Sequence, residues 1–169
     1  GMSLRTRIPV FDEIALRYAP TMILAMAGML WSVIFGVFFG AVAAIYSGKW
    51  QDYLAMFVSV SGISIPQFWL GLLLIQFLGV YLGWFPVAGY TGKFTELVLP
   101  SLTLGATVAA IMARFTLSAF LDVLGEEYIS TARAKGVPER LVMWKHAFRN
   151  ALIPVVTMAG LQFGFLLGG

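Results

Sequence analysis

Residues 126–154, with the sequence EEYISTARAKGVPERLVMWKHAFRNALIP, form a polar segment between two strongly apolar ones. This segment holds five of the eleven Lys and Arg residues of the chain. Gly136 can adopt a left-handed backbone without steric cost, and Pro138 fits the first turn of a new helix, where a backbone N–H is not needed. The segment therefore predicts two short helices that meet near Gly136.

The two predicted helices differ in the distribution of their charges. In the first helix, acidic Glu126 and Glu127 come at the start and basic Arg133 and Lys135 at the end, which is the order that a helix dipole favours. In the second helix, apolar residues recur at helical spacing and predict one apolar face. This face consists of Leu141, Trp144, Phe148 and Leu152, and the other sides carry Glu139, Arg140, Lys145 and Arg149.

The composition around this segment is that of a membrane protein. Sixty per cent of the 169 residues are hydrophobic and 11% are charged. Charged residues are absent from 18–48, 53–92, 97–113 and 150–169. Because a helix needs about 20 apolar residues to cross a hydrocarbon core of about 30 Å, these intervals predict an all-α, polytopic helical membrane protein. The alternating short segments of a membrane β-barrel are not seen.

We expect spans at 21–46, 56–82 and 98–124, and the start of a further span at 153–169. The uncharged interval 53–92 has a helical length of about 60 Å, twice that of one crossing. Either it crosses twice or part of it lies outside the core. We prefer one span that is kinked at Pro66, followed by an interfacial segment with an aromatic belt of Trp84, Phe85 and Tyr90. We expect Pro100 to start the third span.

Residues 1–18 form a polar lead-in, and 10–18 form an amphipathic segment that anchors at the interface. Three spans place this lead-in and the 125–152 loop on opposite sides of the membrane. The loop side carries six cations, including Lys49, and the other side carries four: Arg5, Arg7, Arg17 and Lys93. The excess of cations on the loop side predicts a cytoplasmic loop and an external lead-in. The net charge of +3 bears on topology and lipid headgroups and does not indicate nucleic acid.

Two features within the spans bear on packing or transport. Gly28, Gly36 and Gly40 approximate a small-residue face, which lets a second helix approach closely. Arg114 lies inside the third span, where a charge is costly unless it faces protein, water or headgroups. Either Arg114 marks a functional site, or its side chain extends to the membrane surface from a position about 12 Å from the polar end of its helix.

The loop resembles that of a known family. EYISTARAKGVPERLVMWKHAFRNALIPVVT (127–157) is similar to the cytoplasmic loop of inner-membrane permease subunits of ATP-binding-cassette importers, in the dipeptide, oligopeptide and nickel group. The likeness covers the whole chain. Within the group, MARFTLSAFLDVLGEEYISTARAKGV (112–137) and GLQFGFLLGG (160–169) look most similar to permeases of glutathione importers. The family's Glu-Ala-Ala signature is replaced by Ser130, Thr131 and Ala132, although Gly136 keeps the family's glycine.

The resemblance implies the fold of a six-helix type I importer permease, of which this chain is the middle. We therefore expect one span before Gly1, and the rest of a fifth span and a sixth after Gly169. It also implies import of di- or oligopeptides or glutathione across the inner membrane by alternating access. The implied partners are two ATP-binding subunits, a second homologous permease subunit, a periplasmic or lipoprotein substrate-binding protein, and membrane lipid.

The resemblance also implies roles for particular residues. Contact with the ATPase is expected at Thr131, Ala132, Arg133, Ala134, Lys135 and Gly136, with Arg133 and Lys135 facing acidic groups of the ATPase. The second helix of the loop contributes His146, Arg149, Asn150 and Pro154. Residues that line the pathway are sought among Ser61, Ser64, Gln67, Trp69 and Arg114, although Ser and Gln also form ordinary hydrogen bonds between helices.

Other functions stay open from the residues alone. The basic loop residues could simply hold anionic lipid. A permease for nickel or another small solute, or a secondary carrier or channel outside this family, would share the apolar pattern. An enzyme would rest on His146 with Asp122, Glu126 and Glu127. One His without Cys is a poor metal site, and no GxxxxGK[ST] motif is present, so we expect no cofactor and no ATPase or other enzymatic activity in this chain.

Overall fold

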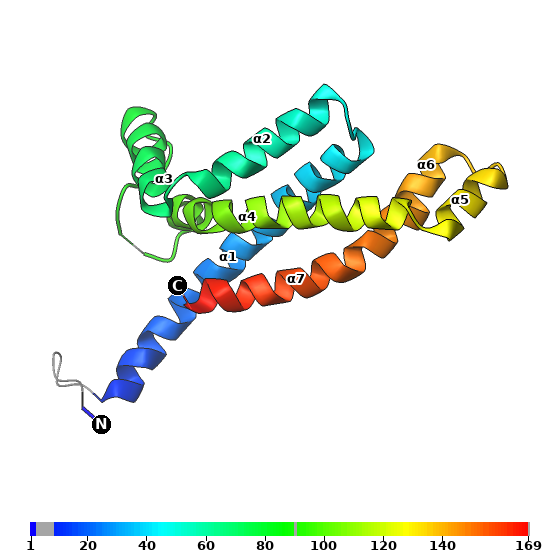
Figure 1. Cartoon of the computed structure of the whole chain (residues 1–169). Coiled ribbons are helices and arrows are strands. Elements are labelled where there is room, and N and C mark those ends of the chain that lie inside the picture. The colour runs from blue at the N-terminus through cyan, green and yellow to red at the C-terminus, as the bar shows by residue number, and fades with distance from the viewer. Residues whose placement is uncertain (3–8, 90, 169) are drawn as a thin grey trace.

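The computed structural model describes residues 1–2, 9–89 and 91–168, so Arg5, Arg7 and Tyr90 lie outside the described residues. The described part contains helices and loops and no β-strand, which confirms the all-α prediction. The elements, drawn in Figure 1, are α1 (Val10–Ile45), α2 (Trp50–Ser64), α3 (Gln67–Leu74), the π-helix η1 (Ile75–Tyr81), α4 (Phe94–Leu124), α5 (Glu127–Ala134), α6 (Glu139–Leu141), the π-helix η2 (Val142–Phe148) and α7 (Arg149–Gly168).

The long helices α1 and α4 pack against each other through the predicted glycine face. Gly28 faces Ser101 and Leu104 of α4, while Gly40, three turns later, faces Ala113 and Thr116. The two helices therefore run in parallel. Glycine lets their backbones approach more closely than larger residues would, and this approach increases the number of van der Waals contacts.

Polar contacts support the same interface. The hydroxyl of Ser32 on α1 lies 2.7 Å from the carbonyl oxygen of Gly28 and 2.9 Å from that of Gly105 on α4. Ser32 is fully buried, so its one proton is shared between two acceptors that water does not reach. A Cβ atom at Gly105 would come within 2.7 Å of the Gly28 carbonyl oxygen, which explains why α4 has glycine at this position.

Helix α7 packs antiparallel to α4. The rings of Phe120 and Phe148 lie 6.1 Å apart near the loop, and Leu166 at the other end of α7 lies close to Leu104 and Val108 of α4. The buried core between α1, α4, the loop and α7 includes Met112, Phe120, Ile129, Val142 and Val155.

The segment between α1 and α4 is broken more sharply than the predicted kink. α2 ends at Ser64, and a new helix begins after Pro66, at an angle of 100° to the first. Gly62 faces Ala106 and Ala110, and Gly71 faces Thr103, so this segment runs antiparallel to α4. Because α1 and α4 are parallel, the segment carries the chain back to the end where α1 begins. One net crossing by this segment fits that geometry, and the placement of the spans in the membrane stays a prediction.

Two helix starts differ from the prediction. The 10–18 segment is no separate helix, because α1 continues through Pro20 from Val10 to Ile45. α4 begins at Phe94, and Pro100 lies inside it. The reason is a cap: the Glu96 carboxylate accepts hydrogen bonds from the backbone N–H of Thr91 at 2.6 Å and of Lys93 at 3.2 Å. This cap satisfies the Lys93 N–H, so the helix begins six residues before Pro100.

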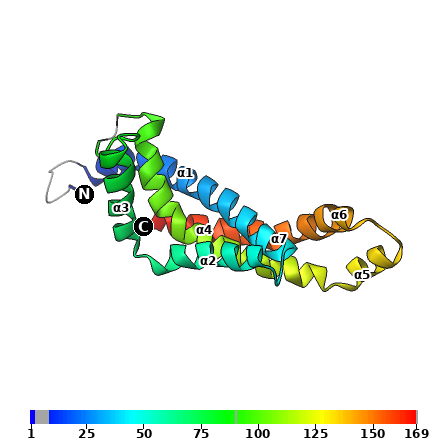
Figure 2. The same ribbon diagram turned by 90° about the horizontal axis from the view of Figure 1, so that it is seen from above.

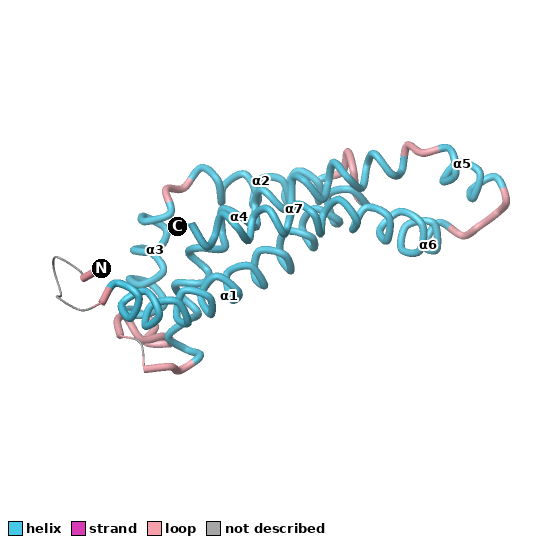
Figure 3. Tube along the Cα trace, turned by 90° about the horizontal axis from the view of Figure 1, so that it is seen from below, coloured by secondary structure: helices cyan, strands magenta, loops and turns pink. Residues whose placement is uncertain are grey.

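The molecule is elongated, with the loop at one end and the α1 N-terminus at the other (Figures 1 and 2). Figure 3 shows the α5–α6 connection projecting beyond the ends of α4 and α7. Within the described residues, three helices are long and apolar enough to cross a membrane, namely α1, α4 and the continuous helical stretch Glu139–Gly168. The bent combination of α2 with α3–η1 qualifies as a broken fourth.

The α1–α4 interface predicts opposite outcomes for two similar substitutions on one helix face. At Gly40, a Cβ atom would collide with the Ala113 carbonyl oxygen and would lie 2.6 Å from Thr116 Cβ, whereas at Gly28 the nearest atom would be 3.5 Å away. We expect Gly40→Ala to destabilise the protein by about 1–3 kcal/mol. Gly28→Ala should be neutral within about 1 kcal/mol, because alanine favours helix. Thermal unfolding of the whole permease in detergent measures both, and equal melting temperatures would contradict the predicted packing.

Candidate functional site

The 125–152 loop projects as two helical pieces joined by a defined turn. At the end of α5, Gly136 has φ of +78°, as the sequence predicts. The N–H of Gly136 donates to the Arg133 carbonyl oxygen at 2.9 Å, and the N–H of Val137 donates to that of Ala132 at 3.2 Å. These two bonds form a Schellman motif, which satisfies the last carbonyl groups of a helix. Ala132 and Val137 are both half-buried against the core, at the two positions whose apolar contact often accompanies this motif.

An ion pair crosses the turn. Arg133 Nη2 lies 2.7 Å from Glu139 Oε1, and Arg133 Nε lies 3.1 Å from Glu139 Oε2. The two parallel bonds fix the geometry of both side chains and hold the pKa of the Arg133 guanidinium above its ordinary value. Arg133, which we expected to face an ATPase, is thus already paired within its own loop.

The predicted apolar face of the second helix is not its buried face. Leu141 and Trp144 are 48% and 55% exposed, and Phe148 and Leu152 are half-buried. The buried residues are instead Val142, Ala147, Ala151 and Val155. The reason is the π-helix η2, whose wider turn changes the spacing between Val142 and Ala147 from four residues to five.

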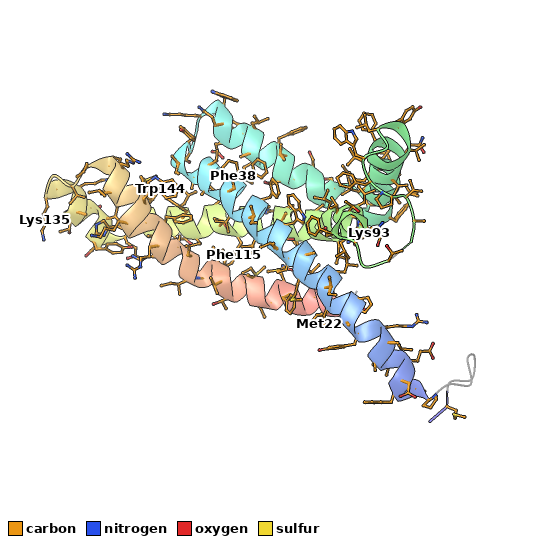
Figure 4. The ribbon with its side chains drawn as sticks, turned by 180° about the vertical axis from the view of Figure 1, so that it is seen from behind. Met22, Phe38, Lys93, Phe115, Lys135 and Trp144 are labelled. Atoms are coloured by element: carbon orange, nitrogen blue, oxygen red, sulfur yellow. The ribbon has the colours of Figure 1, made fainter. Side chains whose placement is uncertain are left out.

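The expected ATPase-contact residues form the exposed tip of the loop, with one exception. Thr131, Ala134, Lys135 and Gly136 are exposed, while Ala132 is half-buried against the core. Figure 4 shows Lys135 at the extreme end of the molecule, far from Lys93 at the opposite end of the bundle. Of the two alanines among the expected contact residues, only Ala134 is exposed enough for a partner to approach it closely.

The second part of the loop is held to α5 by a hydrogen bond between Asn150 and Tyr128, which the sequence did not predict. Asn150 Nδ2 lies 2.7 Å from the hydroxyl oxygen of Tyr128 and 2.9 Å from the backbone carbonyl oxygen of His146. Tyr128 was not predicted, because its role depends on a partner 22 residues away that no spacing rule links to it. Arg149 and Pro154 are exposed.

The residues proposed to line a pathway do not form one cluster. Ser61 and Ser64 donate to carbonyl oxygens of their own helix, at 2.7 Å to Phe57 and 3.0 Å to Val60. Trp69 is 47% exposed. Arg114 is exposed on α4 and belongs to neither of the two cavities described next.

Gln67 is the candidate that the structure places in cavity walls. It borders a cavity of about 600 Å³ between α3, α4 and the 86–89 segment, and another of about 210 Å³ between α3, α4 and α7. Its Nε2 lies 3.5 Å from the Thr103 carbonyl oxygen. Gln162 of α7, which was missed, lies on the wall of the smaller cavity. Most other residues that line the smaller cavity are apolar, so the side-chain amides of Gln67 and Gln162 are its main polar groups.

The residues considered for an enzyme do not assemble a metal site. Within residues 1–2, 9–89 and 91–168, no group of three His, Cys, Asp or Glu side chains is placed to hold a metal ion. His146 takes part in the loop through its backbone carbonyl oxygen. The described geometry is thus one of a packed, projecting loop on a helical bundle.

The helical bundle and its loop place the chain in a family. Residues 36–169 match the inner membrane component of binding-protein-dependent transport systems, and the chain belongs to that family. It is a multi-pass inner-membrane protein, as predicted. Over all 169 residues it is 57% identical to the glutathione transport system permease protein GsiC of Escherichia coli strain K12, and equally to those of Escherichia coli strain UTI89 and Shigella flexneri serotype 5b. The chain spans 55% of the length of each of these relatives.

The ion pair across the turn predicts a charge-specific effect on the loop. We expect Arg133→Glu to speed amide hydrogen exchange in residues 133–139 by up to about fivefold, because exposed ion pairs contribute little to stability. The swapped pair, Arg133→Glu with Glu139→Arg, should restore slow exchange. Arg140→Glu makes the same change of charge without removing a member of the Arg133–Glu139 pair. If Arg140→Glu speeds exchange as much as Arg133→Glu does, net charge and not the pair sets the rate.

Proposed function

We propose that this chain is part of the permease subunit of an ATP-driven importer that moves glutathione or related short peptides into the cell. Two observations support the proposal: membership of the binding-protein-dependent family and 57% identity to glutathione permeases over the whole chain. The partners in this proposal are two ATP-binding subunits, a second permease subunit and a substrate-binding protein. ATP hydrolysis would belong to those subunits, and this chain would supply the pathway and the coupling.

The single observation that carries the mechanism is the rigid loop that projects from the end of the bundle. A transport subunit without an ATP site must receive its free energy from a partner through a mechanical contact. The tip exposes small and basic residues: Ala134 and Gly136 permit close approach, and Lys135 supplies a charge for acidic groups at the rim of the ATPase groove. α5 would then seat in a groove of the ATPase, and ATP-driven closure would push it.

The substrate would pass where Gln67 and Gln162 line the smaller cavity at the α3–α4–α7 junction. Amide groups can hydrogen-bond the peptide bonds and carboxylates of a glutathione-like molecule without holding it tightly. The opposite end of α7 carries the loop, so one helix links the tip to this cavity. Alternating access would follow from small displacements of α7 against α4.

A bulky residue at the tip should block ATPase docking. We expect Ala134→Trp in the whole permease to lower the amount of co-purified ATPase at least about tenfold, because overpacking of a close interface is costly. Ser47→Trp is the matched control, since it places the same side chain in the exposed α1–α2 turn at the same end of the bundle. Quantitative mass spectrometry of purified complexes measures both. ATPase recovery equal to that of the wild type for Ala134→Trp would contradict docking through this tip.

A further inference from the structure

The loop tip is joined to α7 by the continuous helical stretch Glu139–Gly168, and a push on α5 displaces α7 fully only if the two helices move as one body. Three contacts bear on this. The Schellman turn and the Arg133–Glu139 pair restrain the tip. Ile129, which is fully buried, anchors the middle of α5 in the core. Burial of Ile129 and Ala132 keeps one face of α5 toward the core, but apolar contacts are not directional, so they oppose small rotations of α5 about its axis only weakly.

A hydrogen-bonded cluster supplies the missing directional contact. The amide of Asn150 has two protons, and its Nδ2 lies 2.7 Å from Tyr128 Oη and 2.9 Å from the His146 carbonyl oxygen. Tyr128 Oη also lies 3.5 Å from that carbonyl oxygen. Tyr128 is the second residue of α5 and Asn150 the second of α7, so the cluster joins the starts of both helices.

The far end of α7 shows what this link would move. α7 continues without a break from Arg149 to Gly168. Its residues Gln162, Phe165 and Leu166 form one wall of the cavity of about 210 Å³ that Gln67 borders. At about 1.5 Å per residue, Leu166 lies about 24 Å from Asn150 along the helix. A displacement at Asn150 therefore reaches the cavity wall through one continuous helix.

We propose that Tyr128 and Asn150 are positioning residues that clamp α5 to α7, so that a push on the loop tip displaces the α7 wall of the Gln67 cavity. The inference rests on the proposed function and adds to it the residues that transmit the movement. Loss of the clamp would let α5 rotate while it stays docked, so that ATP is hydrolysed with less movement of α7. The expected sign of this loss is ATP hydrolysis that is uncoupled from transport while the ATPases stay bound to the permease.

The first experiment measures coupling in the whole transporter. The permease is reconstituted in lipid vesicles with its partner permease, ATPases and binding protein, and the number of glutathione molecules imported per ATP hydrolysed is measured. Tyr128→Phe and Asn150→Leu should each lower this ratio about three- to tenfold, the range that one hydrogen bond supports. The double variant should be no worse than the poorer single one, because both changes break the same link. Tyr53→Phe, at an exposed tyrosine of α2, is the control.

Each result has one reading. An unchanged ratio in both single variants, or additive losses in the double variant, overturns the clamp. Loss of the ATPases from Tyr128→Phe or Asn150→Leu while the wild type retains them also overturns it, because the residues would then serve docking. If the wild type itself retains no ATPases or imports no glutathione, the proposed function or its substrate fails, and the second experiment decides on the clamp.

The second experiment needs neither ATPase nor substrate. Spin labels are attached to cysteines placed at exposed Ala134 and Leu161 in a whole permease without other cysteines, and the distance distribution between them is measured. Tyr128→Phe removes one oxygen atom and should broaden the distribution, while Tyr53→Phe should leave its width unchanged. Equal widths in both variants and the wild type overturn the clamp.

Discussion

The close approach of α1 and α4 is the interaction on which the rest of the structure depends. Glycines on both helices allow backbone atoms to meet where any Cβ atom would collide, at Gly36 and Gly40 on α1 and at Gly105 on α4. Within lipid, apolar burial does not drive helix association, so close van der Waals contact and the buried Ser32 hydrogen bond must do so. This contact sets the two helices parallel. α2 and α7 then pack antiparallel along the same helix, α4, and the chain can return only once between α1 and α4.

The loop follows from the same bundle. α4 ends and α7 begins at the same end of the bundle, near Phe120 and Phe148, so the chain between them has to turn outside the bundle. It does so with two short helices joined by a turn that two Schellman hydrogen bonds close, from the N–H groups of Gly136 and Val137. Ile129 and Val142 bury this hairpin against the core. A projecting segment that is anchored in this way can carry force, which a flexible connection of the same length would absorb.

The chemistry of the chain agrees with a mechanical role. Its ionisable groups lie mostly at the two ends of the bundle, and the polar side chains at the smaller cavity are amides and a hydroxyl. Such groups bind weakly and reversibly. In the proposed importer they would let a substrate pass, and the free energy for the cycle would arrive through the loop tip.

The sequence by itself determined the helical class, the family, the turn at Gly136 and the glycine face of α1, because each depends on local chemistry: apolar length, a left-handed backbone and small residues at helical spacing. Other features depended on contacts between distant residues. The sequence predicted an apolar face for the second loop helix but not which of its residues are buried, since a π-helix shifts the spacing and packing against α4 decides which residues face inward. The Tyr128–Asn150 link and the place of Gln67 between two cavities needed the tertiary structure, because side chains 22 and 36 residues from their partners meet only once the helices have packed.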